Sequence, residues 1–186
     1  MVRLGEICKF QSGGTPSKGN PLYFGGDIPW ITTVALNGNV IGENDAVDWI
    51  TEKAIAESAA KIVPANSIMV GTRVGVGKVA INSVPMSTSQ DIISLLEIDE
   101  DKWDKMFICR FIISKNEFLQ SQSRGATIKG IKIETLSNLI LPDISIEDQT
   151  FIAHKFEKIE CLKLTILRVL DKMELLEKSQ MQEYFG

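Results

Sequence analysis

The fold is decided by a stretch that runs from Gly125-Ala126-Thr127-Ile128-Lys129-Gly130 through Leu139-Ile140-Leu141-Pro142 to Ser145-Ile146-Glu147-Asp148-Gln149. Upstream of it, short apolar segments alternate with turns that contain Gly and Pro, as in a globular unit. Downstream, residues 147–183 contain no Gly or Pro, and residue types that lose little side-chain freedom in a helix are plentiful. The sequence therefore predicts a globular unit followed by one long helix, with Ser145 as the N-cap.

The long helix carries an apolar seam. At roughly 1.5 Å per residue it would be about 55 Å long, more than a globular unit of this size covers with its own core. Apolar residues recur along it at alternating steps of three and four, which is the spacing of a coiled coil. The seam consists of Ile159, Leu162, Ile166, Val169, Met173 and Leu176. The seam predicts a partner helix, and Phe151, Ile152 and Phe156 are expected to pack on the globular unit. The alternative is a helix that lies along its own domain.

The globular part is predicted to mix α and β structure, so that the fold class is α+β. Strands are expected at residues 27–32, 92–98 and 139–141, with a β-hairpin over residues 74–81. Helices are expected at residues 51–60 and 103–122, with a short helical or turn segment at residues 131–136. The strands are short, and the sequence contains no internal repeat or low-complexity linker.

Composition narrows the class of protein. With 186 residues, of which 44% are hydrophobic and 24% charged, the chain has room for one core and an appendage. No apolar run approaches the roughly 18 residues of a membrane span, and no signal-peptide pattern is present, so we expect a cytoplasmic protein without membrane contact. Cys8, Cys109 and Cys161 are widely spaced, and the only histidine is His154 in the helix. Neither a metal site nor histidine-based catalysis is predicted.

Charge and glycine motifs bear on possible ligands. The net charge is −4, so bulk positive charge does not bring this chain to nucleic acid. Residues 102–132, however, contain seven Lys and Arg against two Asp and Glu, a segment that suits phosphates or, equally, a solvated surface. Gly75-Val76-Gly77-Lys78-Val79-Ala80 matches a dinucleotide pattern, but Pro85 follows too soon for the helix that would hold a pyrophosphate. No cofactor and no catalytic residues are predicted.

Eight short pieces, in order along the whole chain, carry a resemblance to a known family. They are Leu4-Gly5-Glu6-Ile7, Ser12-Gly13-Gly14-Thr15-Pro16-Ser17, Asp27-Ile28-Pro29-Trp30-Ile31-Thr32, Val63-Pro64-Ala65-Asn66-Ser67-Ile68, Ser87-Thr88-Ser89-Gln90-Asp91-Ile92, Gly125-Ala126-Thr127-Ile128-Lys129, Leu141-Pro142 and Glu147-Asp148-Gln149-Thr150-Phe151-Ile152-Ala153. With these pieces the sequence resembles one half of the DNA-specificity (S) subunit of a Type I restriction-modification system. Each piece alone is weak, but eight in register are specific.

The resemblance implies a target recognition domain over residues 1–145 and a conserved-region helix over residues 146–186. Family members usually hold two such units. Their recognition domains each read one half of an interrupted DNA sequence, and their helices pair antiparallel as a ruler on which modification subunits dock. The implied partners are double-stranded DNA, a methyltransferase (modification) subunit, a restriction/motor subunit and a second copy of the chain, bound through the C-terminal helix. Because this chain carries one unit, a half-subunit that forms a homodimer and a fragment of a longer product both remain open.

A DNA reader needs hydrogen-bonding groups at base edges and cations at phosphates, not a nucleophile. Polar residues in four loops fit this need. The candidate DNA-binding residues are Thr15, Ser17, Lys18, Thr72, Arg73, Lys78, Ser87, Thr88, Gln90, Arg124, Thr127 and Lys129. Arg and Gln side chains can pair bidentately with guanine and adenine, respectively. For each residue a structural or solvated role is the alternative, and the 125–130 loop would also serve as a junction between domain and helix.

Two other function classes compete with this interpretation. One is a coiled-coil adaptor, or protein-interaction module, whose globular part binds no DNA. The other is an enzyme whose site the sequence does not reveal. Salt-sensitive binding to duplex DNA separates the first from a DNA reader, and activity of the isolated chain on S-adenosylmethionine or ATP would support the second.

Overall fold

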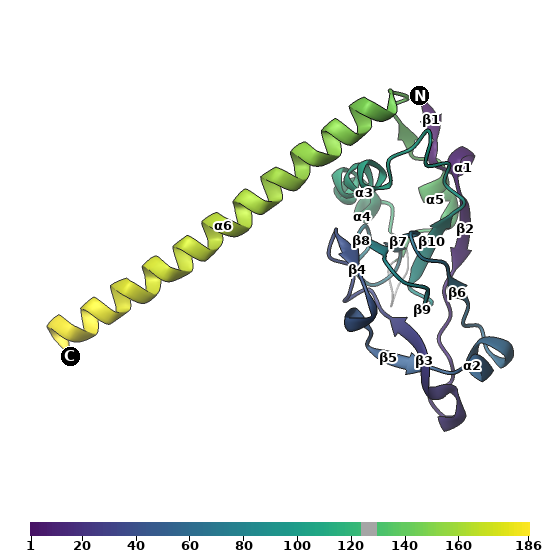
Figure 1. The fold of residues 1–186 in the computed structure, drawn as a ribbon, viewed down its shortest axis with the longest axis horizontal. Helices are drawn as coiled ribbons and strands as arrows, with labels where there is room; N and C mark the ends of the chain where they lie inside the picture. Colours follow the sequence, from purple (N-terminus) through teal and green to yellow (C-terminus); the bar gives the residue numbers. More distant parts are fainter. Residues whose placement is uncertain (124–129) are drawn as a thin grey trace.

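The computed structural model describes residues 1–123 and 130–186. A globular body of three small sheets and several short helices carries one long helix, which leaves the body at one end and projects well beyond it (Figure 1). The α+β class and the long C-terminal helix that the sequence predicts are confirmed.

The larger sheet forms the main core. Its strands lie in the spatial order β2 (Lys9–Ser12), β10 (Ile92–Leu96), β7 (Ile68–Gly71), β8 (Val79–Asn82) and β4 (Val40–Ile41). Neighbouring strands are antiparallel except β4 and β8, which are parallel. Helix α3 (Lys105–Ser114) packs on this sheet, and Val70, Leu95 and Ile108 are completely buried between them. A β-hairpin is present here, but the predicted bounds of 74–81 were wrong, because its strands are β7 and β8 and residues 74–78 lie in the loop between them.

A second sheet forms the other half of the body. Its strands lie in the order β5 (Asp48–Ile50), β3 (Phe24–Ile31), β9 (Met86–Thr88) and β6 (Ile62–Val63). Helix α2 (Glu52–Glu57) begins at Thr51, whose Oγ1 accepts the Ala54 N–H at 3.2 Å. Trp30, Ile50 and Ala54 form a separate small core here. Short 3-10 helices, Pro21–Tyr23 and Glu43–Asp45, lie in the connections.

The two ends of the body meet at the base of the long helix. Strand β1 (Val2–Arg3) pairs antiparallel with β11 (Ile140–Leu141), and helix α1 (Leu4–Ile7) lies against α5 (Ile133–Ser137). The Leu4 N–H donates to the Leu139 carbonyl at 2.8 Å. The N-terminus therefore lies beside the start of the long helix (Figure 1).

The single helix predicted over residues 103–122 is two helices, α3 and α4 (Asn116–Ser121). Helix α3 begins at Asp104, whose carboxylate accepts the Phe107 N–H at 2.8 Å. Lys115, with φ −96° and ψ 7°, lies outside the helical region and separates the two. The apolar period continues through Leu119, which is buried, so the period alone did not reveal the break.

The long helix α6 spans Ile146–Phe185. Ser145 caps it as predicted, because its Oγ accepts the Asp148 N–H at 3.1 Å. Within α6 only Gln149 and Ala153 are buried. Among the described residues, no helix is long and apolar enough to cross a membrane.

The prediction for the start of α6 was partly wrong. Ile152 packs against the main core, but Phe151 and Phe156 are 62% and 45% exposed. The residues of α6 that are buried or packed on the main core are Gln149, Ile152 and Ala153, which follow the helical spacing of three and four. The aromatic side chains lie outside this narrow face, and Ala153, about two turns into the helix, is the last buried residue of α6.

The cysteines differ in exposure, which gives a direct test of the packing. Cys161 is exposed on α6, whereas burial raises the pKa of the Cys8 and Cys109 thiols to about 12. Because the thiolate is the reactive form, a thiol-specific reagent at about pH 8 is expected to modify Cys161 alone in the folded protein and all three cysteines after unfolding. Mass spectrometry measures the outcome. Modification of Cys109 as fast as Cys161 in the folded chain would contradict the structure.

Candidate nucleic-acid interface

Three loops emerge from the same end of the larger sheet. They follow or precede the antiparallel strands β2, β7, β8 and β10, and comprise residues 13–18, 72–78 and 89–91. The Gln90 N–H donates to Thr15 Oγ1 at 3.4 Å, which joins the first loop to the third. Arg73 Nη1 lies 3.9 Å from Asp91 Oδ1, which joins the second to the third. We call these three loops, together with residues 130–132, the loop edge.

Thr72 connects three parts of the loop edge. Its backbone N–H and its Oγ1 both donate to the Asp91 carbonyl, at 2.8 and 3.1 Å, and its own carbonyl accepts the Ile131 N–H at 2.8 Å. The side chain is only 3% exposed. The prediction that Thr72 contacts DNA is therefore corrected, because its hydrogen-bonding groups hold loops together.

The prediction that Ser87 and Thr88 contact DNA is also corrected. Both lie in β9 between β3 and β6, and both are completely buried. The Gly14 N–H donates to the Thr88 carbonyl at 2.8 Å, and a Cβ on Gly13 would lie 2.3 Å from Thr88 Oγ1. A side chain at Gly13 would therefore clash, and the glycine pair serves this close approach rather than a ligand.

The remaining candidates in the described loops are exposed. This exposed set consists of Thr15, Ser17, Lys18, Arg73, Lys78 and Gln90. The contacts described above bring them to one edge from three separate loops. Arg124, Thr127 and Lys129 lie outside the described residues.

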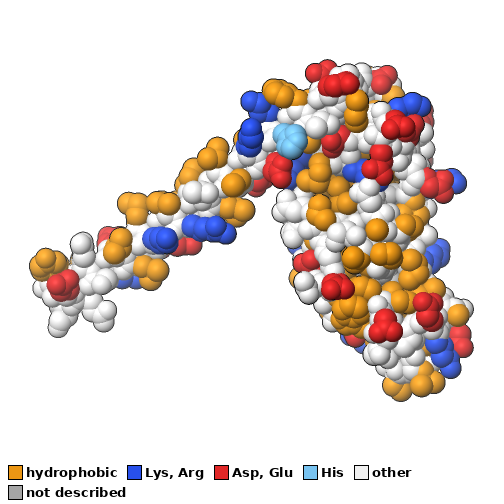
Figure 2. All heavy atoms as spheres, in the orientation of Figure 1, with side chains coloured by type: hydrophobic (Ala, Val, Ile, Leu, Met, Phe, Trp, Pro, Cys, Tyr) orange, Lys and Arg blue, Asp and Glu red, His pale blue; other side chains and the backbone are white. Residues whose placement is uncertain are grey.

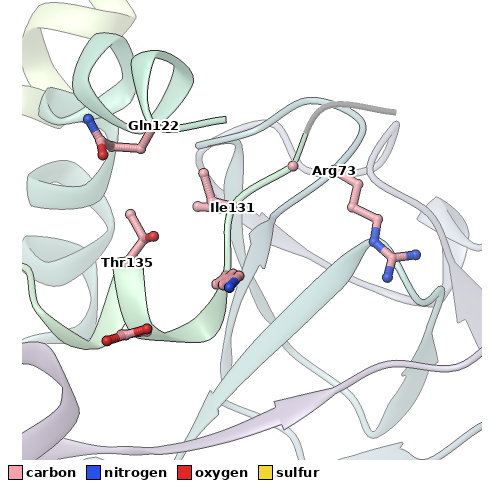
Figure 3. A pocket seen from close by; sticks show the side chains of 7 residues that line it. Arg73, Gln122, Ile131 and Thr135 are labelled. Atoms are coloured by element: carbon pink, nitrogen blue, oxygen red, sulfur yellow. The ribbon is translucent and has the colours of Figure 1, made fainter. Parts of the chain in front are cut away.

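A cavity of about 570 Å³ lies beside Arg73. It is lined by Arg73, Gln122, Gly130, Ile131, Lys132, Glu134 and Thr135. Gln122 and Thr135 lie on one side of Ile131 and Arg73 on the other (Figure 3). Sequence reasoning missed Gln122 and Lys132 as candidates, although the basic segment at residues 102–132 already contained both.

The loop edge is more positive than the chain as a whole. Its described cations are Lys18, Arg73, Lys78 and Lys132, and the nearby carboxylates are Asp91 and Glu134. An anionic backbone would therefore meet an excess of positive charge here despite the net charge of −4. Within the described residues, no cluster of His, Cys, Asp and Glu is arranged to hold a metal ion.

The second candidate element is the seam of α6. The seam residues are 46% to 64% exposed, and Figure 2 shows hydrophobic side chains along the projecting helix. At about 100° per residue, the centre of the seam lies roughly 120° around the helix from the face that packs on the body. The body therefore leaves the seam open along its whole length.

The structure joins a globular body with an accessible polar loop edge to a long helix with an open apolar seam. This architecture suits recognition by the body and association through the helix. The family model described as the Type I restriction modification DNA specificity domain matches residues 1–174. The chain belongs to this family.

Curated relatives and solved structures agree with this assignment. The chain is 32% identical over 154 residues to the Type I restriction enzyme MjaIX specificity subunit of Methanocaldococcus jannaschii, covering 82% of this chain and 36% of that protein. It is 30% identical over 189 residues to the EcoR124I/EcoR124II specificity subunit of Escherichia coli, covering 97% and 46%. The chain thus spans less than half the length of these relatives.

The fold recurs in solved structures of the same kind. A chain from a structure of a type I R-M system superimposes with a TM-score of 0.74 at 18% identity, covering 98% of this chain and 43% of that one. The HsdS subunit from Thermoanaerobacter tengcongensis gives a TM-score of 0.68 at 17% identity, covering 90% and 39%. At these identities the likeness concerns the fold.

Proposed function

We propose that this chain is a DNA sequence-recognition subunit of a Type I restriction-modification complex and that it reads one half of a bipartite target. Residues 1–145 form the target recognition domain, and the loop edge faces the DNA. The observation that carries the proposal is the convergence of exposed polar and cationic side chains from three loops at one end of the sheet, in a member of the specificity family.

The chemistry of such a target fits these side chains. Lys18, Lys78 and Lys132 suit phosphate oxygens. The guanidinium of Arg73 offers two donors that suit a guanine edge, and the amide of Gln90 offers one donor and one acceptor that suit an adenine edge. Cleavage and methylation are the work of separate restriction and modification subunits, which this chain directs to the target. The rival interpretation as an adaptor without DNA binding is not favoured by the family.

A second copy of the chain, bound through the seam, would supply the reader for the other half of the target. Two copies paired antiparallel about a two-fold axis would place Ile159 of one copy beside Leu176 of the other, and Ile166 beside Val169. This register buries all six seam positions of each copy and carries the two bodies to opposite ends of the helix pair. Two identical readers related in this way would recognise an interrupted palindrome.

Removing a single phosphate contact tests the loop edge. The variant Lys78→Ala is expected to weaken duplex binding on all sequences and to reduce the slope of log affinity against log salt by about 0.9. Fluorescence anisotropy over a salt series measures both quantities. Lys102→Ala is the matched control, because Lys102 is an exposed lysine paired with Asp99 outside the loop edge. Equal effects of the two variants, or wild-type binding that does not depend on salt, would contradict the proposed interface.

A further inference from the structure

The first turn of α6 is attached to the body through one buried amide. Gln149 is 1% exposed and makes three hydrogen bonds. Its Oε1 accepts the Asp104 N–H at 3.0 Å, and its Nε2 donates to the carbonyls of Lys102 and Ile144 at 2.9 and 3.0 Å. One side chain therefore joins the start of α3, the start of α6 and the segment that precedes α6.

A neighbouring contact strengthens the same junction. Thr150 Oγ1 donates to Asp104 Oδ2 at 2.9 Å, while Asp104 Oδ1 accepts the Phe107 N–H and caps α3. The carboxylate of Asp104 thus links the first turns of the two helices. Hydrogen bonds have preferred directions, whereas the apolar burial of Ile152 and Ala153 is non-directional. The network fixes an angle as well as a contact.

The length of the helix makes this angle important. Beyond Ala153, α6 has no buried residue, so contacts near its first turn determine its direction (Figure 1). The centre of the seam lies roughly 28 Å along the helix from Gln149, so a tilt of about 5° would move it by about 2.5 Å. This displacement approaches the spacing of base pairs, about 3.4 Å.

We propose that Gln149 is a positioning residue that sets the angle between the recognition body and α6, and thereby makes the complex selective for one gap between the half-sites. This inference rests on the proposed function. Gln149 touches no DNA in this scheme and acts only through the direction of the helix.

The test replaces the amide by an apolar side chain of similar size, as Gln149→Leu. The full complex, assembled with the modification subunit of the same system, methylates a series of targets whose gap changes one base pair at a time. The wild-type complex is expected to lose about tenfold or more in methylation rate for each base pair away from its optimal gap, because small misplacements of a reacting site carry large rate penalties. The Gln149→Leu complex is expected to lose less than about threefold for each base pair. Half-site sequences stay unchanged.

The body offers a matched control. Asn82 is a completely buried amide with four hydrogen bonds, since its Oδ1 accepts the Ser67 N–H and its Nδ2 donates to the carbonyls of Pro64, Val84 and, at 3.4 Å, Val63. Asn82→Leu is expected to lower the melting temperature as Gln149→Leu does, yet to keep the sharp gap preference. Equal broadening by both variants would mean a general loss of stability and would overturn the inference.

A distance measurement tests the angle without DNA. Spin labels on Cys161 and on a cysteine introduced as Glu117→Cys report the distance from α6 to α4, with labelled chains diluted into unlabelled ones. Gln149→Leu is expected to broaden the distance distribution of wild type, and Asn82→Leu to leave it unchanged. If Gln149→Leu does not fold, Thr150→Val removes the neighbouring bond and should broaden it to a smaller extent.

The outcomes separate the inference from the proposed function. An unchanged distribution and an unchanged gap profile in a folded Gln149→Leu protein would overturn the role of Gln149. A second outcome combines a broadened distance distribution in Gln149→Leu with a wild-type complex that methylates no split target. It would support the role of Gln149 in setting the angle of α6 and would reject the proposed function.

Discussion

Replacing Ile166 and Met173 with Glu is expected to convert a dimer into a monomer. Both residues are about 60% exposed in the single chain and lie near the middle of the seam. A dimer would lose four buried apolar side chains, each contributing about 2 kcal/mol, and would have to bury four carboxylates in their place. A loss of about 8 kcal/mol alone corresponds to a dissociation constant raised by more than about 10⁵-fold.

Light scattering over a range of concentrations measures this change, with circular dichroism to follow the helix. The matched control is Leu164→Glu with Leu175→Glu, because both leucines are exposed but lie roughly 160° around the helix from the centre of the seam. The control should remain dimeric. Equal masses for wild type and the Ile166→Glu, Met173→Glu protein would show that the seam is not the interface.

Changing the length of α6 is expected to change the preferred gap between the half-sites. Deletion of residues 163–169 removes one heptad and keeps Ile159, Leu162, Met173 and Leu176 in phase as a shorter seam. The rod shortens by about 10 Å, which corresponds to at most about three base-pair steps. Because each step also turns the duplex by about 34°, we expect an optimum that is one to three base pairs shorter.

Methylation of targets with varied gaps measures this result. Duplication of residues 163–169 is the complementary variant, which adds a heptad to the seam and should lengthen the preferred gap. Deletion of residues 165–168 disturbs the heptad phase and should instead weaken association. A folded, active heptad deletion with an unchanged optimum would reject the idea that the helix sets the gap.

Local features of the sequence were sufficient to predict the long helix. The absence of Gly and Pro, the cap at Ser145 and the seam period all depend on residues a few positions apart, and helix formation depends on the same short range. The ordered motifs were likewise sufficient for the family resemblance that the family model confirms.

Only the tertiary structure decided which polar residues reach the surface. Thr72 and Thr88 belong to polar segments that look like their exposed neighbours in sequence, but pairing with distant strands and the close approach of Gly13 bury them. The same holds at the start of α6, where Gln149 is buried and Phe151 exposed, against their usual preferences. Two of the three partners of that amide lie more than 40 residues away. Contacts over such distances depend on the folded body, which no local pattern describes.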